Sequence, residues 1–96
     1  MRFASVRHKG LKRYIERGDV SGLPLVYASK LAAMITLLGA MRRIDEVMAV
    51  EKWHIHPLTG DRKGDWSFAV SRNWRLTFRL GEADGVIYDL DFEDYH

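Results

Sequence analysis

The sequence has no cysteine, only two prolines and no long uninterrupted apolar run. Without cysteine there are no disulfides and no thiolate metal sites, so the chain should be indifferent to the redox state of its compartment. No apolar stretch approaches the roughly 18 residues that a membrane span needs, and the N-terminal residues lack the apolar core of a signal peptide. We therefore expect a cytoplasmic protein with no membrane segment.

Low-complexity segments, internal repeats and linkers are also missing from the sequence. Hydrophobic residues make up 47% of the chain and charged residues 29%, which is ordinary for a globular protein and argues against disorder. A chain of 96 residues is long enough for one modest core. Residues 1–96 are expected to form a single domain.

Positive charge is absent from the end of the sequence. Residues 81–96 hold six Asp and Glu and no Lys or Arg, whereas residues 1–80 hold all 15 Lys and Arg against seven acids, a net charge of +8. A basic body attracts nucleic acid or acidic partners. The simpler explanation is a solvated surface that pairs with its own acidic tail.

Hydrophobic periodicity predicts two helices in the first half of the sequence. A short one should end at Gly18, because the residues before it include apolar side chains at helical spacing, Leu11, Tyr14 and Ile15. A longer helix is expected from Leu25 to about Met41, where four apolar residues share a face, Leu31, Met34, Ile35 and Leu38. Residues 42–51 are expected to add a short further turn.

From Trp53 onward, apolar and polar residues alternate with a period of two. This pattern predicts four strands, at residues 53–56, 66–71, 75–80 and 86–92. Helices followed by such a run indicate an α+β fold, in which two N-terminal helices pack on one face of an antiparallel β-sheet meander. Residues 2–6 could add a short extended segment.

Strand register follows from the rule that directly paired residues point to the same face of a sheet. Keeping Phe68 and Leu76 on one face requires paired numbers with an even sum, which a two-residue loop of Arg72 and Asn73 does not allow. We therefore expect a three-residue loop, 72–74, or a nearby bulge. With the same parity at the next turn, the core face of the last strand carries Val86, Tyr88, Leu90 and Phe92. The opposite, polar face then carries His54, His56, Ser67, Ser71, Arg75, Thr77, Arg79, Asp89 and Asp91.

Two residues on this polar face could take part in phosphate chemistry. His56 could act as a general acid or base near neutral pH, although a plain surface histidine at a strand end is the simpler explanation. Arg75 could hold a phosphate and stabilise negative charge in a transition state, or it could form a cross-strand ion pair with Asp89 or Asp91. Alternation places His56 and Arg75 on one face but does not say whether they are neighbours.

The sequence closes on a carboxylate, a phenol and an imidazole, in Asp94, Tyr95 and His96. These groups suit metal-free cleavage of a phosphodiester, in which one group takes a proton from a ribose 2′-hydroxyl and another protonates the leaving oxygen. The simpler explanation is a frayed polar terminus. The last predicted strand leads directly into this tail, which we expect to reach the polar face.

No metal ion or cofactor is expected. His54 and His56 lie two apart on a predicted strand, but two histidines with acids only elsewhere in the sequence are a weak metal signal. A glycine-rich phosphate loop is missing. Gly60 and Gly64 flank a charged turn whose side chains could contact a nucleic-acid backbone or simply be solvated.

Several segments, taken together, resemble the HigB toxins of the RelE/ParE superfamily. They are HKGLK at residues 8–12, IHPLTGDRKG at 55–64, WS at 66–67, NWRLTF at 73–78, YD at 88–89 and EDYH at 93–96. The likeness keeps the order and spacing of the family over nearly the whole chain and is weakest between residues 19 and 52. Its most specific parts are the segment from His56 to Arg62 and the terminal EDYH.

The resemblance implies a RelE-like fold and a toxin of a type II toxin–antitoxin system. It implies a ribosome-dependent endoribonuclease that cuts messenger RNA in the ribosomal A site and needs no cofactor. It also implies inhibition by a HigA-type antitoxin, a helix-turn-helix protein that binds DNA. The toxin itself would meet DNA only through this partner.

By the same resemblance, catalysis is assigned to His56, Arg75, Asp94, Tyr95 and His96. The two histidines would assist proton transfer, and the carboxylate would act as a base or orient a neighbour. The phenol would position the nucleotide, and the guanidinium would stabilise the phosphate. The side chains expected to bind RNA or the ribosome are Lys9, Lys12, Arg13, Arg62, Lys63 and Arg79.

One departure from the family pattern keeps other functions open. Many relatives have lysine where this chain has Thr59, and threonine cannot supply the charge, although Lys63 or Arg62 could compensate from the same loop. The first alternative is a non-catalytic toxin that inhibits a protein target, as ParE-type toxins do. The second is a plain nucleic-acid binder, against which the acidic tail counts.

Overall fold

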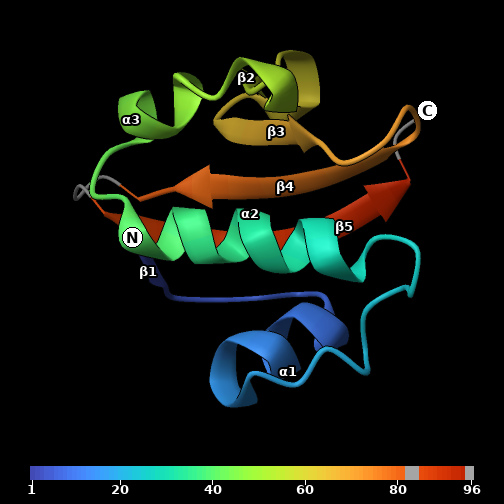
Figure 1. The fold of residues 1–96 in the computed structure, drawn as a ribbon. Helices are drawn as coiled ribbons and strands as arrows, with labels where there is room; N and C mark the ends of the chain where they lie inside the picture. Colours follow the sequence, from blue (N-terminus) through green and yellow to red (C-terminus); the bar gives the residue numbers. More distant parts are fainter. Residues whose placement is uncertain (82–84, 95–96) are drawn as a thin grey trace.

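The computed structural model describes residues 1–81 and 85–94, which form a five-stranded sheet with three α-helices and two short 3₁₀ helices (Figure 1). The helices are α1 (Lys9–Arg17), α2 (Ala28–Ala40) and α3 (Ile44–Met48), and the 3₁₀ helices are Glu51–Trp53 and Gly60–Arg62. The strands are β1 (Arg2–Phe3), β2 (His56–Pro57), β3 (Asp65–Ala69), β4 (Trp74–Leu80) and β5 (Val86–Asp94). The α+β class predicted from the sequence is confirmed.

The first helix, α1, is capped at both ends. At its start, Nδ1 of His8 accepts hydrogen bonds from the backbone N–H groups of Gly10 (3.1 Å) and Leu11 (3.2 Å). At its end, Gly18 takes a left-handed conformation with φ of 70°, and its N–H donates to the carbonyl of Tyr14, so the predicted stop is confirmed. His8 is therefore a structural histidine, because the helix uses its Nδ1 lone pair.

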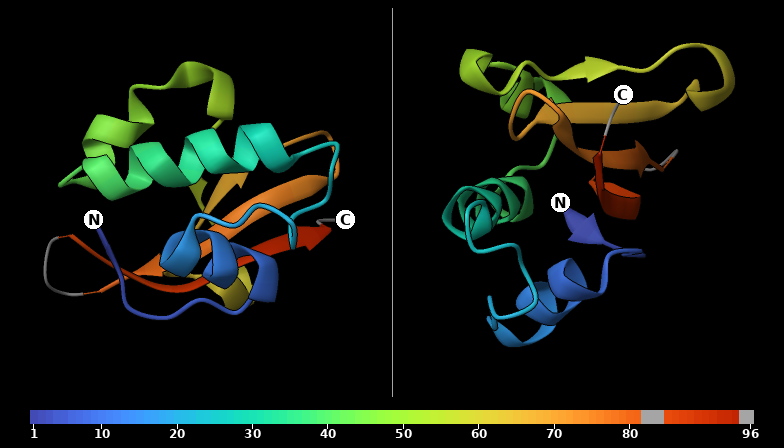
Figure 2. Two further views of the ribbon diagram at one scale, coloured as in Figure 1. Left: turned by 60° about the horizontal axis from the view of Figure 1, so that its bottom comes forward. Right: turned by 90° about the vertical axis from the view of Figure 1, so that its right-hand side faces the viewer.

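The loop between α1 and α2 is pressed against the start of α1. A Cβ on Gly10 would lie 2.0 Å from the carbonyl oxygen of Gly22, so only glycine fits there. The hydroxyl of Tyr14 also lies 3.2 Å from Oγ1 of Thr36 on α2. Figures 1 and 2 show that α2 crosses one face of the sheet, while α1 lies beyond the β1 edge. Of the two helices expected on one face, α2 thus covers that face and α1 stands beside it.

The long helix α2 buries the four side chains predicted to share its inner face, Leu31, Met34, Ile35 and Leu38. It begins three residues later than Leu25, because residues 25–27 form a turn in which the Tyr27 N–H donates to the carbonyl of Pro24 at 2.9 Å. The extra turn expected between residues 42 and 51 is α3, and a 3₁₀ helix follows it.

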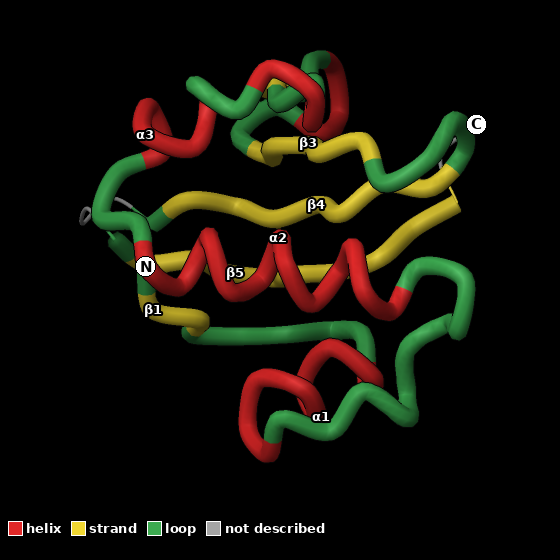
Figure 3. The backbone as a smooth tube through the Cα atoms, viewed as in Figure 1, coloured by secondary structure: helices red, strands yellow, loops and turns green. Residues whose placement is uncertain are grey.

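The strands lie in the order β1-β5-β4-β3-β2. β2 to β5 are antiparallel neighbours, as predicted, but β1 is parallel to β5, so the sheet is mixed rather than a purely antiparallel meander. This pairing continues past β1, since the Ala4 N–H donates to Ile87 (2.7 Å) and the Arg7 N–H to Leu90 (2.8 Å). Figure 3 shows this N-terminal segment running alongside β5. The extended segment expected near residues 2–6 is therefore an edge of the sheet.

The strand predicted at residues 53–56 is wrong for most of its length. Trp53 ends a 3₁₀ helix, His54 takes a left-handed conformation with φ of 47°, and only His56 and Pro57 pair with β3. Trp53 is nevertheless buried as expected, with its ring 5.7 Å from that of Phe68. A helical turn and a kink therefore bring the indole inward, where the alternating pattern had suggested a strand.

The register between β3 and β4 has the predicted even parity. Ser67 lies opposite Thr77, and Phe68 lies opposite Leu76. The loop is one residue earlier than expected, because the Val70 N–H donates to the carbonyl of Trp74 at 3.0 Å and Trp74 already belongs to β4. Residues 71–73 therefore form the three-residue turn.

The parity predicted between β4 and β5 holds only for the second half of β5. On the N-terminal side of Asp89 the pairing is shifted by one residue, so that Ile87 is fully buried and the expected inward position of Tyr88 is wrong. Asp89 has φ of 55°, and its N–H donates to Oγ of Ser5 at 2.8 Å. The N-terminal segment thus stabilises a bulge that reverses the faces of β5.

The core lies between α2 and the sheet face that α2 covers. Leu11 from α1 and Val47 from α3 complete it, together with buried side chains from the strands, Phe68, Leu76, Phe78, Ile87 and Leu90. Within the described ranges, the structure has no helix of the length and apolar character that crossing a membrane requires.

Candidate active site

A hollow of about 620 Å³ opens where the turn between β3 and β4 meets the first turn of α2. It brings together His56 and Arg75, whose proximity the sequence left open. Its described lining contains three cations and two histidines but no carboxylate; the residues are Lys30, His54, His56, Ala69, Val70, Ser71, Arg72 and Arg75. An anionic ligand therefore suits it better than a cationic one.

Strand pairing sets the spacing of the two predicted catalytic side chains. His56 lies opposite Ser67, and Arg75 lies opposite Ala69, so both point to the face of the sheet away from α2. They are separated by β3, which places their strands about 10 Å apart.

His56 has a defined tautomer. Its Nδ1 lies 3.0 Å from the backbone carbonyl oxygen of His54, and this oxygen can only accept a hydrogen bond. Nδ1 therefore carries the proton, and Nε2 of the neutral ring holds a lone pair. The left-handed conformation of His54 positions this carbonyl. An exposed imidazole with an unprotonated Nε2 can act as a general base.

The end of β5 lies beside the turn that lines this hollow. Asp94 lies opposite Trp74, so it shares the face of Trp74, and its neighbour Glu93 lies opposite Arg75. Alternation therefore turns Glu93, rather than Asp94, to the face of His56. Asp94 nevertheless ends β5 beside the first residue of β4, at the turn that lines the hollow. Tyr95 and His96 lie outside the described residues.

Arg62 is bound within the protein. Its guanidinium donates to both carboxylate oxygens of Glu93, at 3.0 and 2.8 Å, and its Nε donates to Asp65 at 3.2 Å. Asp65 also accepts from Nε of Arg79 at 3.2 Å, and Glu93 accepts from the hydroxyl of Thr77. Hydrogen bonds from Arg62 are the main reason that the pKa of Glu93 is lowered, and Glu93 raises the pKa of Arg62.

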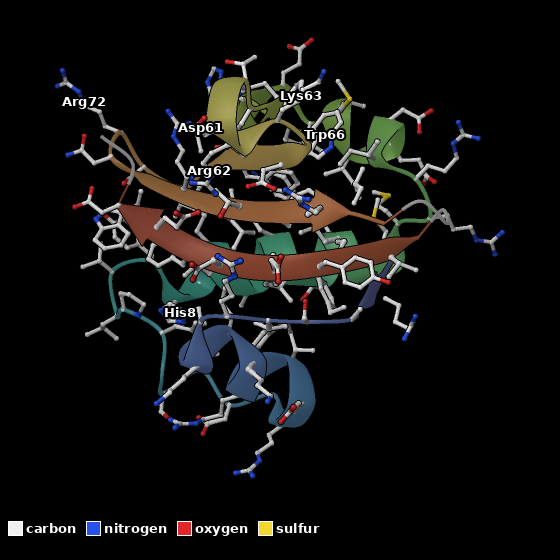
Figure 4. All side chains as sticks on the ribbon, turned by 180° about the vertical axis from the view of Figure 1, so that it is seen from behind. His8, Asp61, Arg62, Lys63, Trp66 and Arg72 are labelled. Atoms are coloured by element: carbon white, nitrogen blue, oxygen red, sulfur yellow. The ribbon has the colours of Figure 1, made fainter. Side chains whose placement is uncertain are left out.

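This ion network closes the polar face next to the hollow. Arg62 reaches from the 3₁₀ helix Gly60–Arg62 across to β5, and Ser67 and Thr77 are buried although they point to the polar side. In Figure 4 the side chain of Arg62 lies against the sheet, whereas Arg72 projects away from the β3–β4 turn. Two of the predicted RNA-binding cations, Arg62 and Arg79, therefore already have acidic partners.

The remaining predicted RNA-binding residues lie on exposed surfaces. Lys9, Lys12 and Arg13 stand on α1 with Arg17, beyond the β1 edge of the sheet. Lys63 is exposed directly after the 3₁₀ helix Gly60–Arg62. The basic surface of α1 and the hollow thus belong to opposite edges of the sheet.

Lys30 and Arg72 line the hollow but were not candidates from the sequence. Arg72 lies in the turn already identified as a loop, so its proximity to Arg75 could have been noticed. Lys30 could not, because only the packing of α2 on the sheet brings it to a turn that lies 40 residues further along. Across residues 1–81 and 85–94, no three His, Asp or Glu side chains converge as a metal site would require.

Comparison with known proteins identifies the class. Residues 4–96 match the family of RelE-like toxins of the type II toxin–antitoxin system HigB, and the chain belongs to this family. As such a toxin it has an antitoxin partner. The protein named endoribonuclease HigB from Proteus vulgaris is 38% identical over 92 residues, a match that covers 96% of this chain and 97% of that protein.

Solved structures show the same fold. YafQ from Escherichia coli strain BL21(DE3) has a TM-score of 0.60 and 18% sequence identity, and the match covers 97% of this chain and 91% of that one. A histidine-to-glutamine mutant of YafQ has a TM-score of 0.59 and 20% identity, with the same coverage. At this level of identity the likeness supports the RelE-like fold and says nothing of individual residues.

Proposed function

We propose that this toxin is a ribosome-dependent endoribonuclease that cuts messenger RNA in the ribosomal A site. The observation that carries the proposal is the hollow at the β3–β4 turn, in which a histidine with a lone pair on Nε2 and an arginine line one anion-attracting site. The name of the Proteus vulgaris relative, endoribonuclease HigB, supports the same reaction class.

In the proposed mechanism, Nε2 of His56 takes the proton of a ribose 2′-hydroxyl. The 2′-oxygen then attacks the adjacent phosphorus, and the bond from phosphorus to the 5′-oxygen of the next nucleotide breaks. His96 donates a proton to that leaving oxygen, so the products are a 2′,3′-cyclic phosphate and a 5′-hydroxyl. Arg75 stabilises the added charge on the phosphorane oxygens, and no metal ion takes part.

The tail residues complete the proposed site. Asp94 ends β5 beside Trp74, whose ring stacks on that of Phe92 at a centroid distance of 4.8 Å. This packing fixes the end of β5 next to the turn that lines the hollow. Asp94 would orient the imidazole of His96, and Tyr95 would stack on the nucleotide.

Binding to the ribosome would use the basic side chains that form no ion pair with the described residues, Lys9, Lys12, Arg13 and Lys63. Arg62 and Arg79 would contribute less, since Glu93 and Asp65 already balance their charge. The antitoxin would be of the HigA type, would place the toxin on DNA only indirectly, and would neutralise it in the cytoplasm.

Primer extension on a message tests the proposal. Purified wild-type chain, ribosomes programmed with a defined message, and the same message without ribosomes are compared, with His96→Ala as the inactive variant. We expect cuts in the A-site codon only with ribosomes and wild-type chain. Growth arrest without any such cuts would replace this function with the alternative, a ParE-like toxin that inhibits a protein target.

A further inference from the structure

Lys30 is held at the mouth of the hollow by a long-range contact. Its Nζ donates to the backbone carbonyl oxygen of Val70 at 2.6 Å, which links the first turn of α2 to the β3–β4 turn. An ammonium group has three hydrogens to donate, and this bond uses one. The bond therefore fixes the charge beside His56 and Arg75 and leaves the group able to bind a further acceptor.

The surroundings favour an anion as that acceptor. No described lining residue of the hollow is acidic, whereas the neighbouring crevice around Arg62 is lined by four carboxylates, Asp65, Asp89, Asp91 and Glu93. The first turn of α2 also lacks an acidic residue, so the positive end of its dipole adds to the potential. The positive charge near Lys30 is thus concentrated at the hollow.

We propose that Lys30 binds a phosphate group of the RNA strand that lies in this hollow. In this role α2 supplies a cation that the loop lacks at Thr59. The inference rests on the proposed ribonuclease function, because it adds a substrate-binding residue to the same site. Lys30 takes no part in proton transfer, so its contribution is to hold the strand.

Binding of an uncleavable RNA tests this directly. The probe is a short fluorescent single-stranded RNA whose 2′-oxygens are methylated, so that the nucleophile is blocked, and binding to the free chain is followed by anisotropy at several salt concentrations. Lys30→Gln should weaken binding roughly tenfold, as expected for loss of one charge-assisted contact. The slope of log K against log salt should fall by about 0.7, the value for one phosphate contact to a single strand.

Arg42→Gln is the matched control, because it removes one positive charge just beyond the other end of α2, where the side chain is exposed. It should leave both the affinity and the salt slope unchanged. Lys30→Arg should restore most of the binding, since it keeps the charge. Thermal denaturation of Lys30→Gln checks that loss of binding does not come from unfolding.

Cleavage on ribosomes gives an independent measurement. Lys30→Gln should raise the concentration of toxin needed for half-maximal cleavage and change the maximal rate little. If Lys30→Gln and Arg42→Gln bind the probe with the same affinity and salt slope, the role of Lys30 is wrong even where wild-type cleavage persists. If wild-type chain binds the probe through Lys30 but never cuts messages, the proposed function fails and the binding site remains.

Discussion

Two neighbouring sites on the sheet differ in whether acidic side chains accompany their basic ones. In the crevice around Arg62, guanidinium groups meet carboxylates, and Glu93 and Asp65 hold Arg62 and Arg79. In the hollow at the β3–β4 turn, three cations and two histidines gather with no carboxylate among the described lining. In the crevice, the positive and negative charges balance one another within the protein. In the hollow, the positive charge of the described lining can attract an anionic ligand. A basic residue on a polar face is therefore a candidate for RNA binding only if its neighbours do not neutralise it.

The largest expected effect comes from His56, in the hollow. His56→Gln keeps a polar side chain but cannot transfer a proton, so cleavage on ribosomes should fall by at least about 100-fold. Because His56 is exposed, the melting temperature should not change. Single-turnover cleavage and thermal denaturation measure the two quantities. Cleavage that stays within a few-fold of wild type would show that His56 is not the base.

The next effect belongs to the ion network and concerns stability. Arg62→Met leaves Glu93 half-buried without its bidentate partner, so the free energy of unfolding should fall by about 1–3 kcal/mol. Urea denaturation measures it. The control is Arg43→Met, which breaks the pair with Asp45, both of whose side chains are 66% exposed, and should cost less than about 0.5 kcal/mol. Equal losses in the two variants would mean that the network is no more than a surface ion pair.

The ion network around Arg62 should also make the stability of the protein depend on pH in the acid range. The pKa of Glu93 is lowered chiefly by hydrogen bonds from Arg62, so its carboxylate stabilises the fold above the ordinary value of 4.5. That stabilisation is lost as the pH falls below 4.5 and through the lower pKa of the folded state. Near pH 7, wild type should therefore have a larger free energy of unfolding than Glu93→Gln. The difference between the two should shrink as the pH falls below 4.5. If the difference in free energy of unfolding between wild type and Glu93→Gln stayed constant down to about pH 3, another group would be responsible for any loss of stability in acid.

The smallest effect separates a structural histidine from the proposed catalytic one. His8→Ala removes the cap of α1 and should cost about 1 kcal/mol, and His8→Asn should restore most of it. Nitrogen NMR should find the proton of neutral His8 on Nε2 and that of neutral His56 on Nδ1, because the first ring accepts at Nδ1 and the second donates there. The same tautomer on both rings would contradict one of these two hydrogen bonds.

Local patterns predicted those parts of the fold that depend on local rules. Helical spacing identified the buried face of α2, and the even-sum rule identified the register of Phe68 against Leu76. The bulge at Asp89 could not be predicted in this way, because it depends on a hydrogen bond that the Asp89 N–H donates to Ser5, a residue 84 positions away. The kink at His54 likewise broke an alternating pattern that looked like a strand.

In the candidate site, too, local patterns identified some residues, and others depend on contacts between distant parts of the chain. His56 and Arg75 were found from residue type and alternation, and the structure places them in one hollow. Lys30 was missed because a surface lysine on a helix carries no signal until the helix is packed. Arg62 was predicted to bind RNA from its place in a charged loop of the family pattern, and its acidic partner Glu93 lies in a strand 31 residues later.

The parallel pairing of the N-terminal segment with β5 also has a consequence for folding. Arg2 pairs with Val86, and Val6 pairs with Leu90, so this edge joins segments that are far apart in the sequence. Contacts between such distant segments close late in folding. The sheet that supports the hollow is therefore completed by one of the slowest pairings in the molecule.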